Sequence, residues 1–426
     1  MNHSHCLKPA NCDSWTAIGW GLILTFHFGM ALPRAAEEAP VPPAAPQARG
    51  GLRVFESVNS SSAQKGSNAM GSRPLAPTNL RLVQAVDKAP AVAMAATSPA
   101  TNPQTSAAPF VIPVLVVSFF PTNGSNIDIG ITGDVGDPVA LIQEKTRRLT
   151  GEVVDALQDG SRYRAYVAAS NPPALVYQVA GSMEYFTSLP TLKPEGTDVP
   201  MTDYQSIMEQ IRIRDWVENK GVKEVWIWGY HGGKVGLWES NMSSRSGDVS
   251  NSDCSTNDLP VLQRTYTVYH YNYQRGASEA VEDHMHQIEA LLNFVDGRHL
   301  TPPDRWSELL FWGKFVGSDK SHRIVRPGCG WAHCPPNALQ DYDWANRVYV
   351  QTDMVDWNPD GSGRKSRINC VRWGCDSLRW FVYWMQHLPG PGNDLTFQGK
   401  RLNNWWVFVG DWDRAMEDRL KLVLDQ

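Results

Sequence analysis

Between residues 110 and 295, continuous apolar runs alternate with stretches in which apolar residues recur every three or four positions. The continuous runs are rich in β-branched and aromatic residues, which is typical of buried strands. They predict four strands, at 111–120, 174–186, 224–230 and 264–273. Because such runs are apolar on both faces, they favour a sheet that is covered by helices.

The stretches between and after these runs have helical spacing. The first predicted helix opens at Asp137-Pro138 and ends at Gly160, and two more cover 203–219 and 275–294. Strands that alternate with helices indicate an α/β fold with a mainly parallel sheet and covering helices. Turns are frequent after the third helix, and 15 of the 17 tryptophans follow residue 200, so we expect a loop-rich, Trp-rich C-terminal half.

The N-terminal part of the chain has a different character. A polar start, an apolar run and small residues after it predict a signal peptide over 1–36, with an uncleaved signal anchor as the alternative. Residues 37–109 are rich in Ala, Pro and Ser, a composition typical of a disordered linker. We therefore expect a secreted or cell-surface protein with a single large α/β domain over 110–426.

Net charge, hydropathy and cysteine content indicate which partners and which cellular compartment the protein is suited to. The formal net charge is −5, from 39 basic and 44 acidic residues, which disfavours a nucleic-acid partner because such proteins carry a basic footprint. Beyond the possible signal anchor, no apolar run approaches the ~20 residues of a membrane span. Five cysteines follow the predicted signal, which in an oxidising compartment favours two disulfides and one free thiol. Cys329 with Cys370 is the favoured pair.

Candidate chemistry lies first at the predicted carboxyl ends of the strands, where open parallel sheets bind ligands. The loop after the third strand holds His231 and Glu239, and Arg275 follows the fourth strand. His231 is a candidate base or ligand-binding residue, although the Gly232-Gly233 that follows it also fits a plain surface turn. Arg275 is suited to hold an anionic or carbonyl group with two hydrogen bonds.

The third predicted helix carries acidic residues and a histidine on one side. Four of them, spaced 3, 4 and 3 apart, lie within an arc of about 80°: Glu279, Glu282, His286 and Glu289. A Glu and a His four residues apart can share a divalent metal ion or form a proton relay. A charged stripe opposite an apolar one is equally typical of a solvated helix face, so both interpretations stand.

The C-terminal half adds further candidates. His333 lies in a Cys-Gly-Trp-Ala-His-Cys-Pro-Pro-Asn segment that ends at Asn337, and Asp343 follows shortly after. His333 and Asp343 complete an acid–base or metal set with His231 and Glu239, although turn formation is the commoner role for a loop Asp. Trp405 and Trp406 follow two asparagines and are predicted to be exposed, as a platform for sugar rings.

These motifs resemble an uncharacterised family of exported bacterial and fungal proteins, over about residues 200 to 412. The resemblance implies export but no particular activity. It rests on the following strings: Val225-Trp-Ile-Trp-Gly-Tyr-His231, Glu239-Ser-Asn-Met-Ser-Ser244, the run 279–289 around His286, Cys329-Gly-x-x-His333, Pro336-Asn337, Asp341-Tyr-Asp343 and Asn404-Trp-Trp406.

Carboxylates and histidines without an evident nucleophilic Ser or Cys indicate water activation, by a general base or by one divalent metal ion. We therefore expect a hydrolase that acts on a polysaccharide or cell-wall polymer. The predicted catalytic residues are Glu239, Arg275, Glu282, His286, His333 and Asp343, those for substrate binding are His231, Asn337, Trp405 and Trp406, and those for metal are Glu279, Glu282, His286 and Glu289. A non-catalytic surface protein that binds polysaccharide through Trp405, Trp406 and Trp357 is the alternative.

Overall fold

The computed structural model describes residues 80–83, 108–193, 198–252, 258–326 and 328–425. The predicted signal peptide and most of the predicted linker lie outside these residues. Among the described residues, no helix is both long and apolar enough to cross a membrane.

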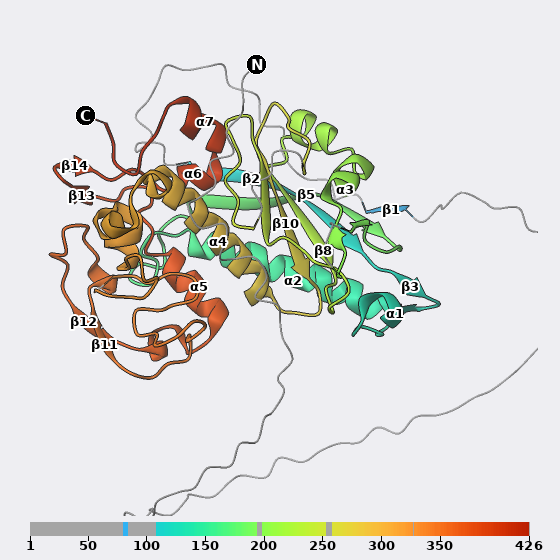
Figure 1. Cartoon of the computed structure of the whole chain (residues 1–426), viewed down its shortest axis with the longest axis horizontal. Coiled ribbons are helices and arrows are strands. Elements are labelled where there is room, and N and C mark those ends of the chain that lie inside the picture. Colours follow the sequence, from blue (N-terminus) through green and yellow to red (C-terminus); the bar gives the residue numbers. More distant parts are fainter. Residues whose placement is uncertain (1–79, 84–107, 194–197, 253–257, 327, 426) are drawn as a thin grey trace, which may run out of the picture. The chain divides into compact units, whose positions relative to one another are not determined.

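A six-stranded mixed sheet forms the centre of the described part of the chain (Figure 1). Its four middle strands are parallel, and an antiparallel strand pairs with each edge. In spatial order the strands are β1 (Leu80–Val83), β5 (Leu175–Tyr185), β2 (Phe110–Phe119), β8 (Glu224–Gly229), β10 (Tyr266–Asn272) and β9 (Ser240–Ser243). The prediction of an α/β fold with a mostly parallel sheet is therefore confirmed.

The two edge strands were not predicted. The backbone of β1 lies within the segment expected to be a linker and pairs with the end of β5. In β9 the sequence is Ser-Asn-Met-Ser, which has no apolar run, and yet all four residues are buried beside β10. Burial against the neighbouring strand thus outweighs the low strand propensity of β9.

Helices cover both faces of the sheet, as the alternation of side chains along β10 shows. Tyr269 and Tyr271 point toward His284 of α4 (Ala277–Val295), and the Tyr271 hydroxyl lies 2.6 Å from its Nε2. His270, between them, points to the other face, where its Nδ1 lies 3.2 Å from the hydroxyl of Tyr204.

Two sets of helices therefore lie on opposite faces. Tyr204 opens α3 (Tyr204–Gln210), which is followed by a π-helical turn at Asp215–Asn219, so the predicted helix 203–219 is interrupted. On the α4 face, α2 (Val139–Gly160) and α5 (Ser377–Met385) pack against α4 (Figure 1).

The C-terminal half is built from short elements, as predicted. They are the 3-10 turns Arg298–Leu300, Pro303–Glu308, Met354–Asp356 and Cys370–Trp373, the π-helical η5 (Leu310–Val316), the hairpins β11–β12 (Val350–Thr352, Ser366–Ile368) and β13–β14 (Thr396–Phe397, Lys400–Arg401), and the helices α6 (Val407–Gly410) and α7 (Trp412–Glu417). The first half adds α1 (Ile129–Thr132) and the two-residue pairs β3–β4 (Thr122–Asn123, Asn126–Ile127) and β6–β7 (Thr191–Leu192, Met201–Thr202).

Two expectations for this half are wrong. Trp405 and Trp406 are each only 1% exposed, and the indole of Trp405 donates to the carbonyl of Leu422, so they belong to the aromatic core and form no surface platform. Among the described residues one disulfide forms instead of the expected two, and it joins Cys370 to Cys375, whereas Cys329 and Cys334 are both buried with free thiols. Here a tight turn after the Cys370–Trp373 helix brings the nearer cysteine into bonding distance.

Candidate functional site

The site lies where α4 passes the outer edge of the sheet. Helix α4 starts just beyond the carboxyl end of β10 and packs beside β9. Glu239 directly precedes β9, whose first residue, Ser240, pairs with Tyr269 in the middle of β10. The Ser240 hydroxyl donates to Gln287 of α4 at 2.6 Å, which fixes the helix against this strand.

Three side chains from two distant segments meet there. Their ligand atoms all lie within 4.8 Å of one another, in a cluster of Glu282, His286 and His333. The Nε2 atoms of His286 and His333 are 3.0 Å apart, and Nε2 of His333 is 3.1 Å from Oε1 of Glu282. The two histidines are separated by 47 positions in the sequence, so only the fold brings them together.

A second layer of contacts orients His286. Its Nδ1 lies 2.8 Å from Oε2 of Glu239, and the same oxygen accepts a hydrogen bond from the Asn251 amide at 2.5 Å. The carboxylate therefore holds the proton of His286 on Nδ1 and leaves Nε2 directed toward His333 and Glu282. Such a carboxylate–histidine pair is the usual outer support of a metal-binding histidine.

His333 is held through the backbone of the residue before it. The amide of Ala332 donates to Oε1 of Glu289 at 2.7 Å. Its carbonyl accepts from the indoles of Trp344 and Trp380, at 2.9 and 3.0 Å. Three separate elements therefore fix the backbone at Ala332, and the ring of Tyr342 packs on His333 with centroids 4.1 Å apart.

The charges of the site shift the pKa values of its groups in opposite directions. Burial lowers the pKa of His286, but the charge and hydrogen bond of Glu239 outweigh it and raise the pKa to about 9. Burial raises the pKa of Glu239, but His286 outweighs it, and the pKa lies below its ordinary value. Burial lowers the pKa of His333 despite its bond to Glu282. Burial raises the pKa of Glu289 to about 7.

The cluster is largely buried, whereas two carboxylates beside it are partly exposed. The side chains of His333 and His286 are 3% and 8% exposed, and that of Glu282 is 14% exposed. Glu239 and Glu279, by contrast, have side chains that are 38% and 40% exposed. These two carboxylates are therefore the parts of the site most accessible to solvent.

The other predicted catalytic and metal-binding residues are not among the three side chains of this cluster and make other contacts. Arg275 is exposed and pairs with Glu279 at 3.7 Å, at the start of α4. Glu289 contacts Ala332 and so supports the loop of His333. Asp343 accepts from the backbone of Leu339 at 2.9 Å, which is a turn-stabilising contact within its own loop.

Two predicted substrate-binding residues have local roles. The amide of Asn337 donates to the carbonyls of Asn346 and Val348, at 2.8 and 2.9 Å, and closes the loop after His333. Nδ1 of His231 lies 2.5 Å from the carbonyl of Val235, within the turn after β8.

Three residues that support the site were not predicted from the sequence. Asn251 and Tyr342 have no motif of their own, and the contacts of Ala332 are made by its backbone. Tyr342 did stand within the Asp341-Tyr-Asp343 string, which was the only signal that pointed near it. Comparisons with family models, with curated proteins and with solved structures found no match to this chain.

Proposed function

We propose that Glu282, His286 and His333 bind one divalent metal ion, and that the protein is a hydrolase that uses this ion to activate water. The observation that carries the proposal is the convergence of two imidazole Nε2 atoms and a carboxylate oxygen, with Nδ1 of His286 held by Glu239.

Two of the three separations between ligand atoms fit a shared ion, and the largest, up to 4.8 Å, fits only if a side chain moves when the ion binds. Ligand atoms at about 2.1 Å from a common ion lie roughly 3.0–3.4 Å from their neighbours. The two distances between Nε2 and its neighbours, 3.0 and 3.1 Å, agree with this spacing. Nitrogen and carboxylate ligands suit zinc and related ions, and three protein ligands leave a coordination position open, as catalytic zinc sites do.

Such an ion supplies Lewis-acid chemistry and lowers the pKa of water. The chain's own residues prepare the site for it. Glu239 keeps the Nδ1 proton on His286, and Glu289 and the two indoles keep the His333 backbone in place. Glu279 and its partner Arg275 are accessible to solvent, where they contact an entering substrate.

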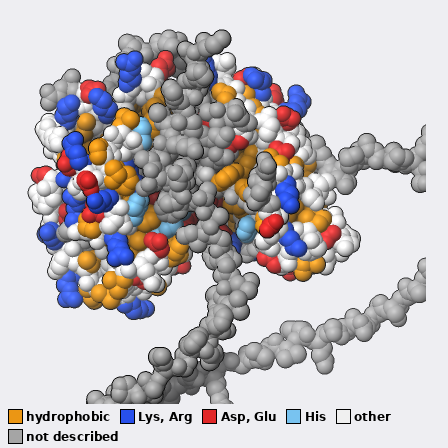
Figure 2. Space-filling model, viewed as in Figure 1, with side chains coloured by type: hydrophobic (Ala, Val, Ile, Leu, Met, Phe, Trp, Pro, Cys, Tyr) orange, Lys and Arg blue, Asp and Glu red, His pale blue; other side chains and the backbone are white. Residues whose placement is uncertain are grey.

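We propose an extracellular polymer such as a polysaccharide as the substrate, because the sequence predicts that the chain is exported. On the face shown in Figure 2, acidic and basic side chains are interspersed. The buried positions of Trp405, Trp406 and Trp357 remove the platform on which the alternative, a non-catalytic polysaccharide-binding protein, depended.

The test is a calorimetric titration of the purified, chelator-treated protein with Zn²⁺ and Mn²⁺, followed by assays on a panel of polysaccharides. We expect one ion per chain, loss of binding in His286→Gln and His333→Gln, and hydrolysis that chelation abolishes and metal restores. His299→Gln is the matched control, because His299 stacks on Phe294 and makes no contact with the cluster. Metal binding that persists in both cluster variants would refute the proposal.

A further inference from the structure

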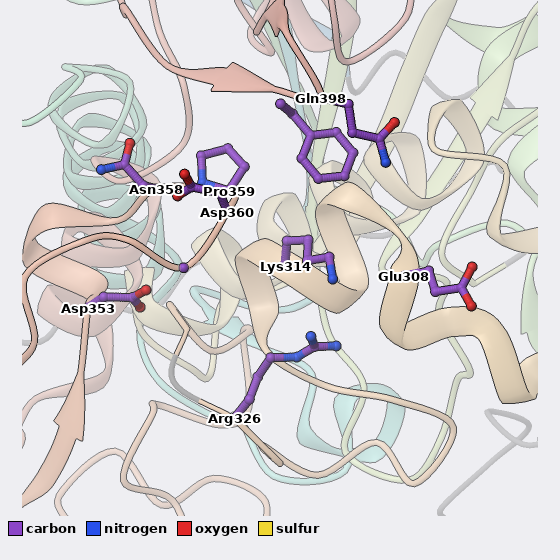
Figure 3. A pocket seen from close by; sticks show the side chains of 10 residues that line it. Glu308, Lys314, Arg326, Asp353, Asn358, Pro359, Asp360 and Gln398 are labelled. Carbon is purple, nitrogen blue, oxygen red and sulfur yellow. The ribbon is translucent and has the colours of Figure 1, made fainter.

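A hollow of about 390 Å³ lies in the C-terminal half of the chain and shares no residue with the histidine cluster. Its size falls within the roughly 300–1,000 Å³ of small-molecule sites. It is lined from four segments: Lys314 of η5, Arg326, the 353–361 turn, and the tip of the β13–β14 hairpin with Phe397 and Gln398. Figure 3 shows these side chains around one space.

Two cations face this hollow. Figure 3 shows the ammonium of Lys314 and the guanidinium of Arg326 directed into the same part of it. Within the part of the chain that the structure describes, neither forms an ion pair, and Glu308 at the rim pairs instead with Arg305 at 2.8 Å. Arg326 donates to the carbonyl of Ser307 at 2.6 Å, but its Nε is buried without a partner. Two like charges held close together favour an anion between them.

A buried carboxylate faces the same space from the other side. Asp353 is only 3% exposed, and its Oδ1 has no hydrogen-bond partner among the described residues. Leaving a buried acceptor without a hydrogen bond is unfavourable, so a ligand that donates a hydrogen bond to this oxygen would be bound more tightly. Figure 3 shows the Asp353 side chain pointing toward the cations across the hollow.

The remaining walls fit a sugar ring and include one further carboxylate, that of Asp360, which is exposed and accepts from the Ser362 amide at 2.9 Å. Pro359 and Phe397 supply apolar surface, and the amides of Asn358 and Gln398 supply both donors and acceptors. A ligand for this set carries a carboxylate for the cations, a hydroxyl for Asp353 and an apolar ring face. A neighbouring hollow of about 510 Å³ shares Phe397, Gln398 and Glu308, so a chain of more than one sugar has room to continue.

From this arrangement we propose that the hollow is a binding site for an acidic sugar. The carboxylate of a uronic acid lies between Lys314 and Arg326, and one of its hydroxyls donates to Oδ1 of Asp353. This site is separate from the metal cluster, so the proposal stands whether or not the chain is a metal-dependent hydrolase.

The test is a titration of the full chain with D-glucuronate, D-galacturonate, D-glucose and inorganic phosphate, followed by calorimetry or protein-observed NMR. We expect at least one uronate to bind at least about tenfold more tightly than glucose and phosphate. Equal binding of phosphate would show a general anion site and overturn the sugar assignment. No uronate binding up to about 10 mM would overturn the proposal altogether.

Substitutions of the residues that line the hollow test whether the uronate binds there. Lys314→Met and Arg326→Met should each weaken uronate binding by about tenfold or more, as should Asp353→Asn, which removes the negative charge of the acceptor at nearly constant size. Lys320→Met is the matched control, because Lys320 pairs with Asp304 on the exposed surface and does not line the hollow. The melting temperature and NMR spectrum of each variant establish that it is folded. Wild-type affinity in folded Lys314→Met and Asp353→Asn would place the uronate elsewhere and refute the assignment.

Discussion

Replacing Glu239 by Gln separates the charge behind His286 from the geometry of the site. The oxygen of Glu239 accepts from both Nδ1 of His286, at 2.8 Å, and the Asn251 amide, at 2.5 Å. In Glu239→Gln the carbonyl oxygen of the new amide takes this position, because its NH₂ group would face two donors. The variant therefore keeps both hydrogen bonds and loses only the negative charge.

The size of the effect follows from that loss. A hydrogen bond to a charged acceptor is about twice as strong as one to a neutral acceptor. Substitution of an outer support of a metal-binding histidine weakens metal binding by about 10- to 100-fold, or about 1.4–2.7 kcal/mol. Glu239→Ala, which also frees the imidazole to rotate, should weaken binding further.

The assay is a zinc titration against a competing chelator, at constant pH and with the folded state checked by circular dichroism. Glu184→Gln is the matched control. Glu184 lies on β5, its carboxylate is buried, and it accepts a hydrogen bond from the Gln143 amide at 2.6 Å. Three strands separate β5 from the β9 edge, so this control should bind zinc as the wild type does. Zinc affinity in Glu239→Gln equal to that of the wild type would refute the metal-support role.

Three further predictions concern the stability of the fold. Burial raises the pKa of Glu224 from 4.5 to about 8, so the folded chain binds this proton more tightly than the unfolded chain, and the stability of the fold should fall as the pH rises from 4.5 to about 8. Glu224→Gln should reduce the decline in melting temperature across this range. An unchanged dependence of melting temperature on pH would contradict the raised pKa of Glu224. Glu289→Ala leaves the Ala332 amide unsatisfied, which should cost about 1–3 kcal/mol in urea unfolding and also weaken zinc binding through His333; intact zinc affinity would show that Glu289 does not position His333. Cys370→Ser removes the disulfide between two cysteines that are five residues apart, and this should lower the free energy of unfolding by roughly 2 kcal/mol, as a reductant should in the wild type. A further loss of stability when the variant is reduced would indicate another disulfide.

The sequence predicted well those features that depend on local periodicity. The apolar runs located the four parallel strands, and the 3, 4, 3 spacing located the acidic side of α4, because side-chain direction in a helix follows from position alone. It did not decide whether this side faces solvent. The structure shows that the loop of His333 covers its C-terminal half, where His286 and Glu289 are buried.

The features that the sequence did not predict depend on packing between distant segments or on local backbone geometry. Trp405 and Trp406 look exposed because asparagines precede them, but the packing of the C-terminal half buries them. The choice of Cys375 over Cys329 as partner of Cys370 depends on a local turn geometry that no pattern reveals. The fixing of Ala332 by Glu289 and Trp380 uses backbone atoms, which carry no signature in the sequence.

The most direct test of the proposed metal centre is X-ray diffraction at the zinc absorption edge from crystals of the zinc-loaded protein. We predict one anomalous peak at about 2.0–2.2 Å from Nε2 of His286, Nε2 of His333 and a carboxylate oxygen of Glu282. A direct hydrogen bond between the two imidazoles, with no peak between them in zinc-loaded crystals, would contradict the account.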